Sequence, residues 1–276
     1  MKRTLARATL ATWLVGCGAP PPAPPHTVEL VRSHYTIPAG SELYQCQAVT
    51  MTQDLYVKRL DPIGPRGVHH TMLGFGTPGT ADGVYPCGPF VGHPVFASGV
   101  NSAGVEFPDP AVVKISAGQQ IVLNLHLFNA TDSELSGDAG IDAQVAAQPE
   151  NYQTAGITLV GPFGFVIDAS RTVDASYTVP HAATWFALFP HMHQTGQHMR
   201  VWKAGATEEV VSDSDFQFDA QTIINHPPVA LVAGDQIRAT CTYDSDGVGK
   251  SFGDSSKSEM CFAITFAYPA LDELAP

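Results

Sequence analysis

The sequence predicts an all-β protein of two tandem antiparallel β-sandwich domains with a jelly-roll-like arrangement. The 276 residues include 25 Gly and 22 Pro but only 14% charged residues, a balance that favours short strands and turns over long helices. Apolar residues recur in short alternating or β-branched runs, and no segment sustains a helical period. A chain of this length can bury a core in each of two domains.

The first residues have the pattern of a targeting segment. Lys2, Arg3 and Arg7 form a positive head, and a mostly apolar run from Ala8 to Val15 follows it. The run is too short to span a bilayer, which takes about 20 apolar residues. We therefore exclude this segment from the expected fold.

The end of that segment resembles the lipobox of bacterial lipoproteins, in which a Cys is lipidated and becomes the mature N-terminus. The matching residues are Leu14-Val15-Gly16-Cys17; an ordinary signal peptide or a frayed helix is the alternative. We expect a lipoprotein signal peptide over 1–16, a Pro-rich tether over 17–27, and export with a membrane anchor through lipid on Cys17. Gly18 lacks the Asp that typically retains lipoproteins at the inner membrane, which favours the outer one.

The remaining chain is expected to divide into an N-terminal domain over 28–152 and a C-terminal domain over 153–276. A turn-then-strand pattern occurs once in each: Ala117-Gly118 precedes a strand, and so does Ala233-Gly234. This repeated pattern suggests two related halves, although such turns recur in any β-protein.

Three stretches are assigned to loops, to a turn or to the connection between the halves. Residues 76–110 are rich in Gly and Pro and predict loops with one or two short strands. Residues 132–140 are polar and predict a surface turn. Residues 143–165 predict the crossing between the halves.

Charge and cysteine content limit the function classes. The net charge of −12 and the lack of a basic stripe argue against nucleic acid as a partner. With Cys17 assigned to lipid, four cysteines remain and allow three pairings. Export favours disulfides, and we expect them within each half, Cys46 with Cys87 and Cys241 with Cys261.

Two histidines near residue 190 are the strongest candidates for metal ligands. His191 and His193 are two residues apart at the end of an apolar strand. Side chains alternate on a strand, so both imidazoles point to one side. Burying an imidazole without a partner is costly, and a shared metal ion is the simplest reason for two on one face.

Four further residues are weaker candidates. His69 and His70 are neighbours that point to opposite faces of a regular strand, so both reach one ion only where the strand twists or bulges. His126 lies in an apolar run, where a lone His is more often a core residue, and Met260 could equally be core packing. A thioether beside Cys261 is nevertheless a soft donor that favours Cu(I). We expect two copper sites from these six residues.

Four stretches in order make the sequence resemble the copper type II, ascorbate-dependent monooxygenases, such as the peptidylglycine α-hydroxylating and dopamine β-monooxygenases. They are Val68-His69-His70-Thr71-Met72-Leu73, Leu123-Asn124-Leu125-His126, Pro190-His191-Met192-His193 and Gly253-Asp254-Ser255-Ser256-Lys257-Ser258-Glu259-Met260-Cys261. Both expected cysteine pairs also fall where the family has them. The resemblance spans roughly residues 35 to 268.

The resemblance implies two coppers per chain. His69, His70 and His126 would hold an electron-storing copper in the N-terminal domain, near Tyr44. His191, His193 and Met260 would hold the copper at which dioxygen binds and a substrate C–H is hydroxylated. Ascorbate or another one-electron donor would reduce both ions, and a solvent-filled cleft would separate the two sites.

Departures from the family pattern limit the substrate. Phe189 stands where peptidylglycine enzymes have an Arg that grips the peptide carboxylate, and Phe262 and Ile264 stand where they have Asn and Tyr. The resemblance therefore implies an apolar pocket and a small nonpolar or aromatic substrate. The alternatives are a non-catalytic copper-binding or storage lipoprotein on this scaffold, or a structural or adhesive β-sandwich, which leaves the histidine pairs unexplained.

Overall fold

The computed structural model describes residues 24–77 and 79–272, which form an all-β protein with one short 3₁₀ turn, η1 (Ser245–Gly247). The predicted fold class is therefore confirmed. The expected signal peptide, Cys17 and most of the tether lie outside the described residues. Within the described part of the chain, no helix has the length and hydropathy needed to cross a bilayer.

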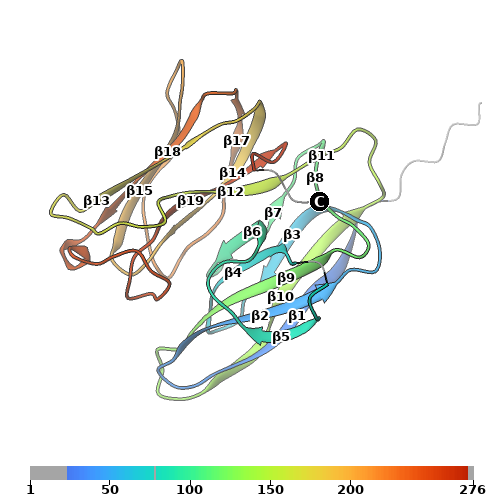
Figure 1. Ribbon diagram of the computed structural model, residues 1–276, viewed down its shortest axis with the longest axis horizontal. Coiled ribbons are helices and arrows are strands. Elements are labelled where there is room, and N and C mark those ends of the chain that lie inside the picture. Colours follow the sequence, from blue (N-terminus) through green and yellow to red (C-terminus); the bar gives the residue numbers. More distant parts are fainter. Residues whose placement is uncertain (1–23, 78, 273–276) are drawn as a thin grey trace, which may run out of the picture.

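The strands up to Thr154 form two sheets, shown in blue to green in Figure 1. The first sheet has the order β1 (His26–Ile37), β10 (Leu135–Ala146), β3 (Leu55–Ile63), β8 (Ala111–Ile115) and β11 (Gln153–Thr154), with β7 (Val105–Glu106) paired to β3. The second has the order β5 (Gly83–Pro86), β2 (Glu42–Thr50), β9 (Gln120–Phe128), β4 (Val68–Phe75) and β6 (His93–Gly99). Val57, Ile141, Leu73 and Leu123, from the two sheets, share one buried core.

The strands from Gly156 onward form two four-stranded sheets, shown in yellow to red in Figure 1. One has the order β12 (Gly156–Val160), β19 (Cys261–Tyr268), β14 (Ala183–Met192) and β17 (Ile224–Leu231). The other has the order β13 (Thr172–Thr178), β18 (Gln236–Tyr243), β15 (Gly196–Ala204) and β16 (Glu209–Asp215).

Both expected disulfides are confirmed. Cys241 of β18 bonds to Cys261 of β19 and so joins the two sheets of the C-terminal half. Cys46 of β2 bonds to Cys87, just after β5, in the N-terminal half.

The repeated Ala-Gly turn has the same structural role in both halves. It carries the chain from one sheet to the other, between β8 and β9 and again between β17 and β18. Gly118 has φ +82° and Gly234 has φ +93°, which side-chain-bearing residues rarely adopt. Each glycine amide also bonds a carbonyl from an earlier segment, Met51 for Gly118 and Val179 for Gly234.

Two of the three expectations for the weakly patterned stretches are wrong in detail. Residues 76–110 contain three strands, β5, β6 and β7. Residues 143–165 contain the crossing between the halves as expected, since β11 belongs to a sheet of the first half and β12 to a sheet of the second. Most of the expected surface turn at 132–140 belongs to β10, paired to β1 and partly to β3. Gly137, which resembles a turn residue, makes room for a ring, because a Cβ there would lie 2.8 Å from Tyr35 Oη.

One apolar core continues from the N-terminal half into the C-terminal half. The rings of Phe96 and Phe266 are 6.4 Å apart, and those of Phe107 and Phe186 are 6.0 Å apart. All four side chains are buried in the same cluster. This shared core brings the ends of β4 and β9 close to the ends of β14 and β19.

We expect Gly118→Ala and Gly234→Ala each to lower the free energy of unfolding by about 1 kcal/mol, because an L side chain is strained at positive φ. A Cβ at either position meets no atom within 4 Å, so the loss reports the backbone alone. Gly164→Ala, equally open but without a positive φ, is the control. Urea unfolding measures all three, and an equal effect at Gly164 would contradict this reason.

Candidate metal centre

Three histidines meet where β4 pairs with β9. The register of the two strands shifts between Val68 and His70, so β4 is irregular at the point where its neighbouring histidines lie. One ring nitrogen from each of His69, His70 and His126 lies within 4.8 Å of the others, and all three residues are buried. The strand irregularity that two adjacent histidines need in order to face one point is therefore present.

His126 is oriented by a carboxylate that the sequence analysis did not single out. Its Nε2 lies 2.7 Å from Glu42 Oε1, and its Nδ1 lies 3.2 Å from His70 Nδ1. With Nε2 donating to the carboxylate, Nδ1 keeps a lone pair. Metal–nitrogen bonds of about 2 Å separate two ligand nitrogens by roughly 3.3 Å in a tetrahedral site. Tyr44 stacks on the His126 ring at 4.4 Å, where the resemblance implies a tyrosine.

His191 is the penultimate residue of β14 and His193 directly follows that strand, with their ring centroids 5.3 Å apart. His191 Nδ1 bonds Gln221 Oε1 at 2.7 Å, and His193 Nδ1 donates to the Ser258 carbonyl at 3.1 Å. These partners leave the Nε2 of each ring to face inward. For His193, that Nε2 is buried and has no hydrogen-bond partner among the described residues.

Met260 immediately precedes β19 and lines an apolar cavity together with His70 and His191. Phe189, Phe262 and Ile264, the predicted pocket residues, line the same cavity. The structure thus places the six predicted ligands around one region of the interior.

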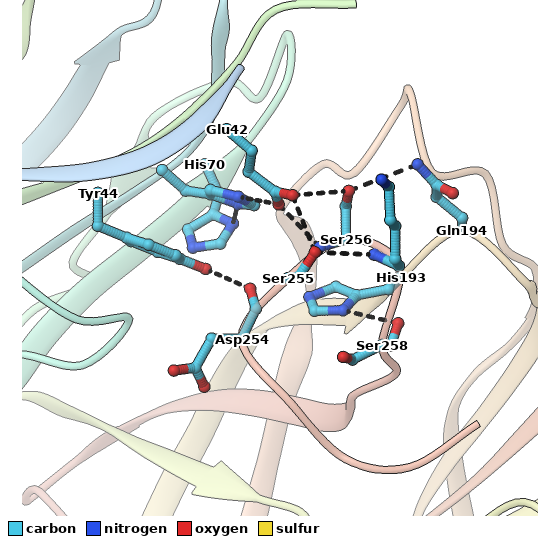
Figure 2. Close-up of polar contacts among 11 residues, drawn as sticks. Glu42, Tyr44, His70, His193, Gln194, Asp254, Ser255, Ser256 and Ser258 are labelled. Atoms are coloured by element: carbon cyan, nitrogen blue, oxygen red, sulfur yellow. Dashed lines mark hydrogen bonds and ion pairs between the residues drawn. The ribbon is translucent and has the colours of Figure 1, made fainter. Parts of the chain in front are cut away.

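Glu259 links Met260, the next residue in the chain, to the segment that carries His191 and His193. Its buried carboxylate accepts bonds from the backbone amides of His193 at 3.1 Å and Thr195 at 2.8 Å. Figure 2 shows His193 beside the loop that precedes Met260.

Burial keeps the imidazoles of His69, His70, His191 and His193 neutral. Desolvation, with the repulsion of neighbouring imidazoles, lowers the pKa of His69 and of His191 to about 3 and that of His193 to about 4. Desolvation likewise lowers the pKa of His70 well below its usual value. Neutral imidazoles have a lone pair to donate, and nitrogen with thioether ligands suits copper. The residues present therefore fit copper.

The expected solvent-filled cleft between the two sites is wrong for this structure. The rings of His70 and His191 lie only 5.0 Å apart, and the cavity beside them has about 20 Å³, room for about one water. The reason is the shared apolar core, in which Met72 of the first half and Phe262 of the second both line the cavity.

Three residues that support the histidines were missed: Glu42, Gln221 and Glu259. Glu42 lies two residues before Tyr44 on β2, so strand alternation could have placed it on the same face. Gln221 and Glu259 lie outside strands and reach their partners only through the tertiary fold. No local sequence pattern indicates them.

The fold and the cluster define an all-β protein with paired sandwiches and buried imidazoles suited to copper. Residues 168–274 match the family model described as copper type II ascorbate-dependent monooxygenase, C-terminal domain. The match supports, over the C-terminal region, the resemblance on which the sequence analysis relied.

Solved structures add only remote similarities. The A223 turret protein of Sulfolobus turreted icosahedral virus is 13% identical, with 86% of this chain and 97% of that chain covered and a TM-score of 0.22. Infectious bursal disease virus VP2 is 8% identical, with 90% of this chain and 72% of that chain covered and a TM-score of 0.26. Latent PorU from Porphyromonas gingivalis is 10% identical, with 83% of this chain and 24% of that chain covered and a TM-score of 0.25. Scores this low carry no argument about fold or function.

We expect the metal-free protein to lose stability as the pH falls from about 7 to about 5.5. The pKa values of His69, His70, His191 and His193 are depressed, so the unfolded chain, with values near 6.5, takes up protons that the folded chain does not. Their contribution is present above about pH 6.5 and is lost on acidification. Urea midpoints across this range measure the effect, and a midpoint that stays constant or rises would contradict it.

Proposed function

We propose that the protein is a copper-dependent monooxygenase that hydroxylates a C–H bond of a small nonpolar or aromatic substrate, using dioxygen and electrons from ascorbate or a similar donor. His69, His70 and His126 would hold one copper, and His191, His193 and Met260 a second. The observation that carries the proposal is that His70, which clusters with His69 and His126, lines one apolar cavity together with His191 and Met260. The C-terminal region of the chain also matches a monooxygenase family model.

The protein supplies oriented ligands and a dry interior. Bound copper would supply reversible electron transfer and the binding of dioxygen. Glu42, Gln221 and the Ser258 carbonyl each hold one ring nitrogen of a candidate ligand, which orients the other nitrogen inward. The thioether of Met260 favours Cu(I) at the second position. Phe262 and the other apolar side chains around the cavity exclude water.

The lining of the cavity supports an apolar substrate. Beside the candidate ligands it consists of carbon-rich side chains, with Phe189 among them and no guanidinium or ammonium. An aromatic path leads outward, since Phe262 lies 5.1 Å from Phe163 and 6.3 Å from Phe90, which are 63% and 38% exposed. Because the cavity has room for about one water, these rings must move apart to admit a substrate.

A non-catalytic copper carrier on the same scaffold is the second candidate. The observation that favours it is the small size of the cavity, about 20 Å³ beside the candidate ligands. A carrier needs oriented ligands but no space for an organic substrate. Copper binding without substrate-dependent oxygen uptake would identify this function.

The proposal places the protein outside the cytoplasm, attached to the bacterial membrane, with the outer one favoured, through lipid on Cys17. One disulfide in each half supports an oxidising compartment. Metabolic labelling with a radioactive fatty acid, compared between the natural chain and Cys17→Ser, tests the anchor.

We expect two copper ions per chain and ascorbate-driven oxygen uptake that requires an apolar substrate. Met260→Ala should lower turnover by more than about 100-fold, beyond the usual effect of losing only a supporting group. Copper at the three-histidine site should survive, because Met260 is not part of that cluster. Metal analysis and an oxygen electrode with a panel of small hydrophobic compounds measure both. Met51→Ala is the control, and activity that persists in Met260→Ala would refute the assignment.

A peptide that ends in glycine should not be hydroxylated. The cavity lining offers no cationic side chain to pair with the peptide carboxylate, and Phe189 occupies the position where the resemblance implies an Arg. Product analysis by mass spectrometry, beside the best small substrate as positive control, makes the comparison. Efficient turnover of the peptide would overturn the substrate class.

A further inference from the structure

Glu42 of the N-terminal half holds a loop of the C-terminal half. The loop, here called the serine loop, comprises residues 253–259 and leads directly into Met260. Glu42 Oε1 accepts the Ser256 amide at 2.7 Å, and Glu42 Oε2 accepts the hydroxyls of Ser255 at 2.9 Å and Ser256 at 3.3 Å. Figure 2 shows the Glu42 carboxylate between His70 and the serine loop.

The same carboxylate orients His126. Its Oε1 also accepts His126 Nε2 at 2.7 Å, so one oxygen receives both a candidate ligand and the serine loop. Tyr44 repeats the connection, because its ring stacks on His126 while its hydroxyl donates to the Asp254 carbonyl at 2.8 Å. The first histidine cluster is thus bonded to a segment more than 120 residues away in sequence.

The other end of the serine loop reaches the second group of candidate ligands. The Ser258 carbonyl accepts a hydrogen bond from His193 Nδ1, and the Glu259 carboxylate accepts one from the His193 amide. Met260 is the next residue in the chain. Gln194 Nε2 donates to the Ser256 hydroxyl at 3.4 Å. One short loop therefore contacts the supports of both sites.

We propose that Glu42 is a positioning residue that couples the two candidate copper sites, by orienting His126 and fixing the serine loop that places His193 and Met260. The copper part of this inference rests on the proposed function. Metal bound at the three histidines would then order the serine loop, and loss of Glu42 would uncouple the two halves.

A carboxylate suits this position for a physical reason. The two oxygens of Glu42 lie within hydrogen-bond distance of groups on His126, Ser255 and Ser256. An ionised carboxylate only accepts, through two oxygens with about four lone-pair sites, and here it meets four donors. A glutamine keeps the shape but replaces one accepting oxygen with a donor.

The test compares Glu42→Gln with Glu134→Gln, an exposed carboxylate, as the matched control. In the metal-free protein, ¹⁵N spectra of the histidine rings report the tautomer of His126, and amide hydrogen exchange reports the order of 253–259. Chelator competition with Cu(I) reports affinity at the three histidines, in a His193→Ala background that disables the other site.

We expect Glu42→Gln to shift the His126 tautomer, to speed exchange in the serine loop, and to weaken Cu(I) at the three histidines by about 10- to 100-fold. Cu(I) should slow exchange in the loop of the His193→Ala protein but not when Glu42→Gln is added. Tyr44→Phe, which removes only the bond to Asp254, should speed loop exchange and leave the His126 tautomer unchanged. Glu134→Gln should change none of these.

Two results would overturn the coupling. Weaker Cu(I) binding with unchanged loop exchange would make Glu42 a local support of His126 alone. Faster loop exchange with unchanged tautomer and affinity would make it an ordinary contact between the halves. If the natural chain binds no Cu(I), the proposed function is wrong, while the metal-free spectra and exchange still decide whether Glu42 links His126 to the loop.

Discussion

The apolar contact between the two halves is the constraint on which the candidate site depends. Phe96 and Phe266, from different halves, belong to one buried cluster that seals the region around His70 and His191. Removal of water from these imidazoles disfavours their charged form. The same packing therefore joins the halves and prepares neutral nitrogen donors. A buried polar group without a partner is costly, so a bound ion would stabilise such groups.

Backbone geometry brings the candidate histidines together, and hydrogen bonds orient their rings. A register shift in β4 lets two neighbouring histidines approach His126 on β9, while plain alternation suffices for His191 and His193. His126, His191 and His193 each bond one ring nitrogen to a partner, which is a carboxylate, an amide oxygen and a backbone carbonyl in turn. The other ring nitrogen of His126 faces His70 Nδ1.

Closure of the site has a functional consequence. The histidines of the two halves lie against each other, and the cavity admits about one water. Catalysis on an organic molecule would then require part of the interface to open, and the exposed rings of Phe90 and Phe163 border an apolar path from the cavity.

The sequence by itself determined the all-β class, both disulfides and the residue types of the candidate site. Strand alternation and turn glycines are local properties, and Gly118 and Gly234 are examples that local reasoning could identify. The tertiary structure alone decided that β10 begins in a polar, turn-like stretch, that the halves close on each other, and that Glu42 meets the serine loop. These features depend on contacts between residues up to 214 positions apart, and no short-range pattern encodes such contacts.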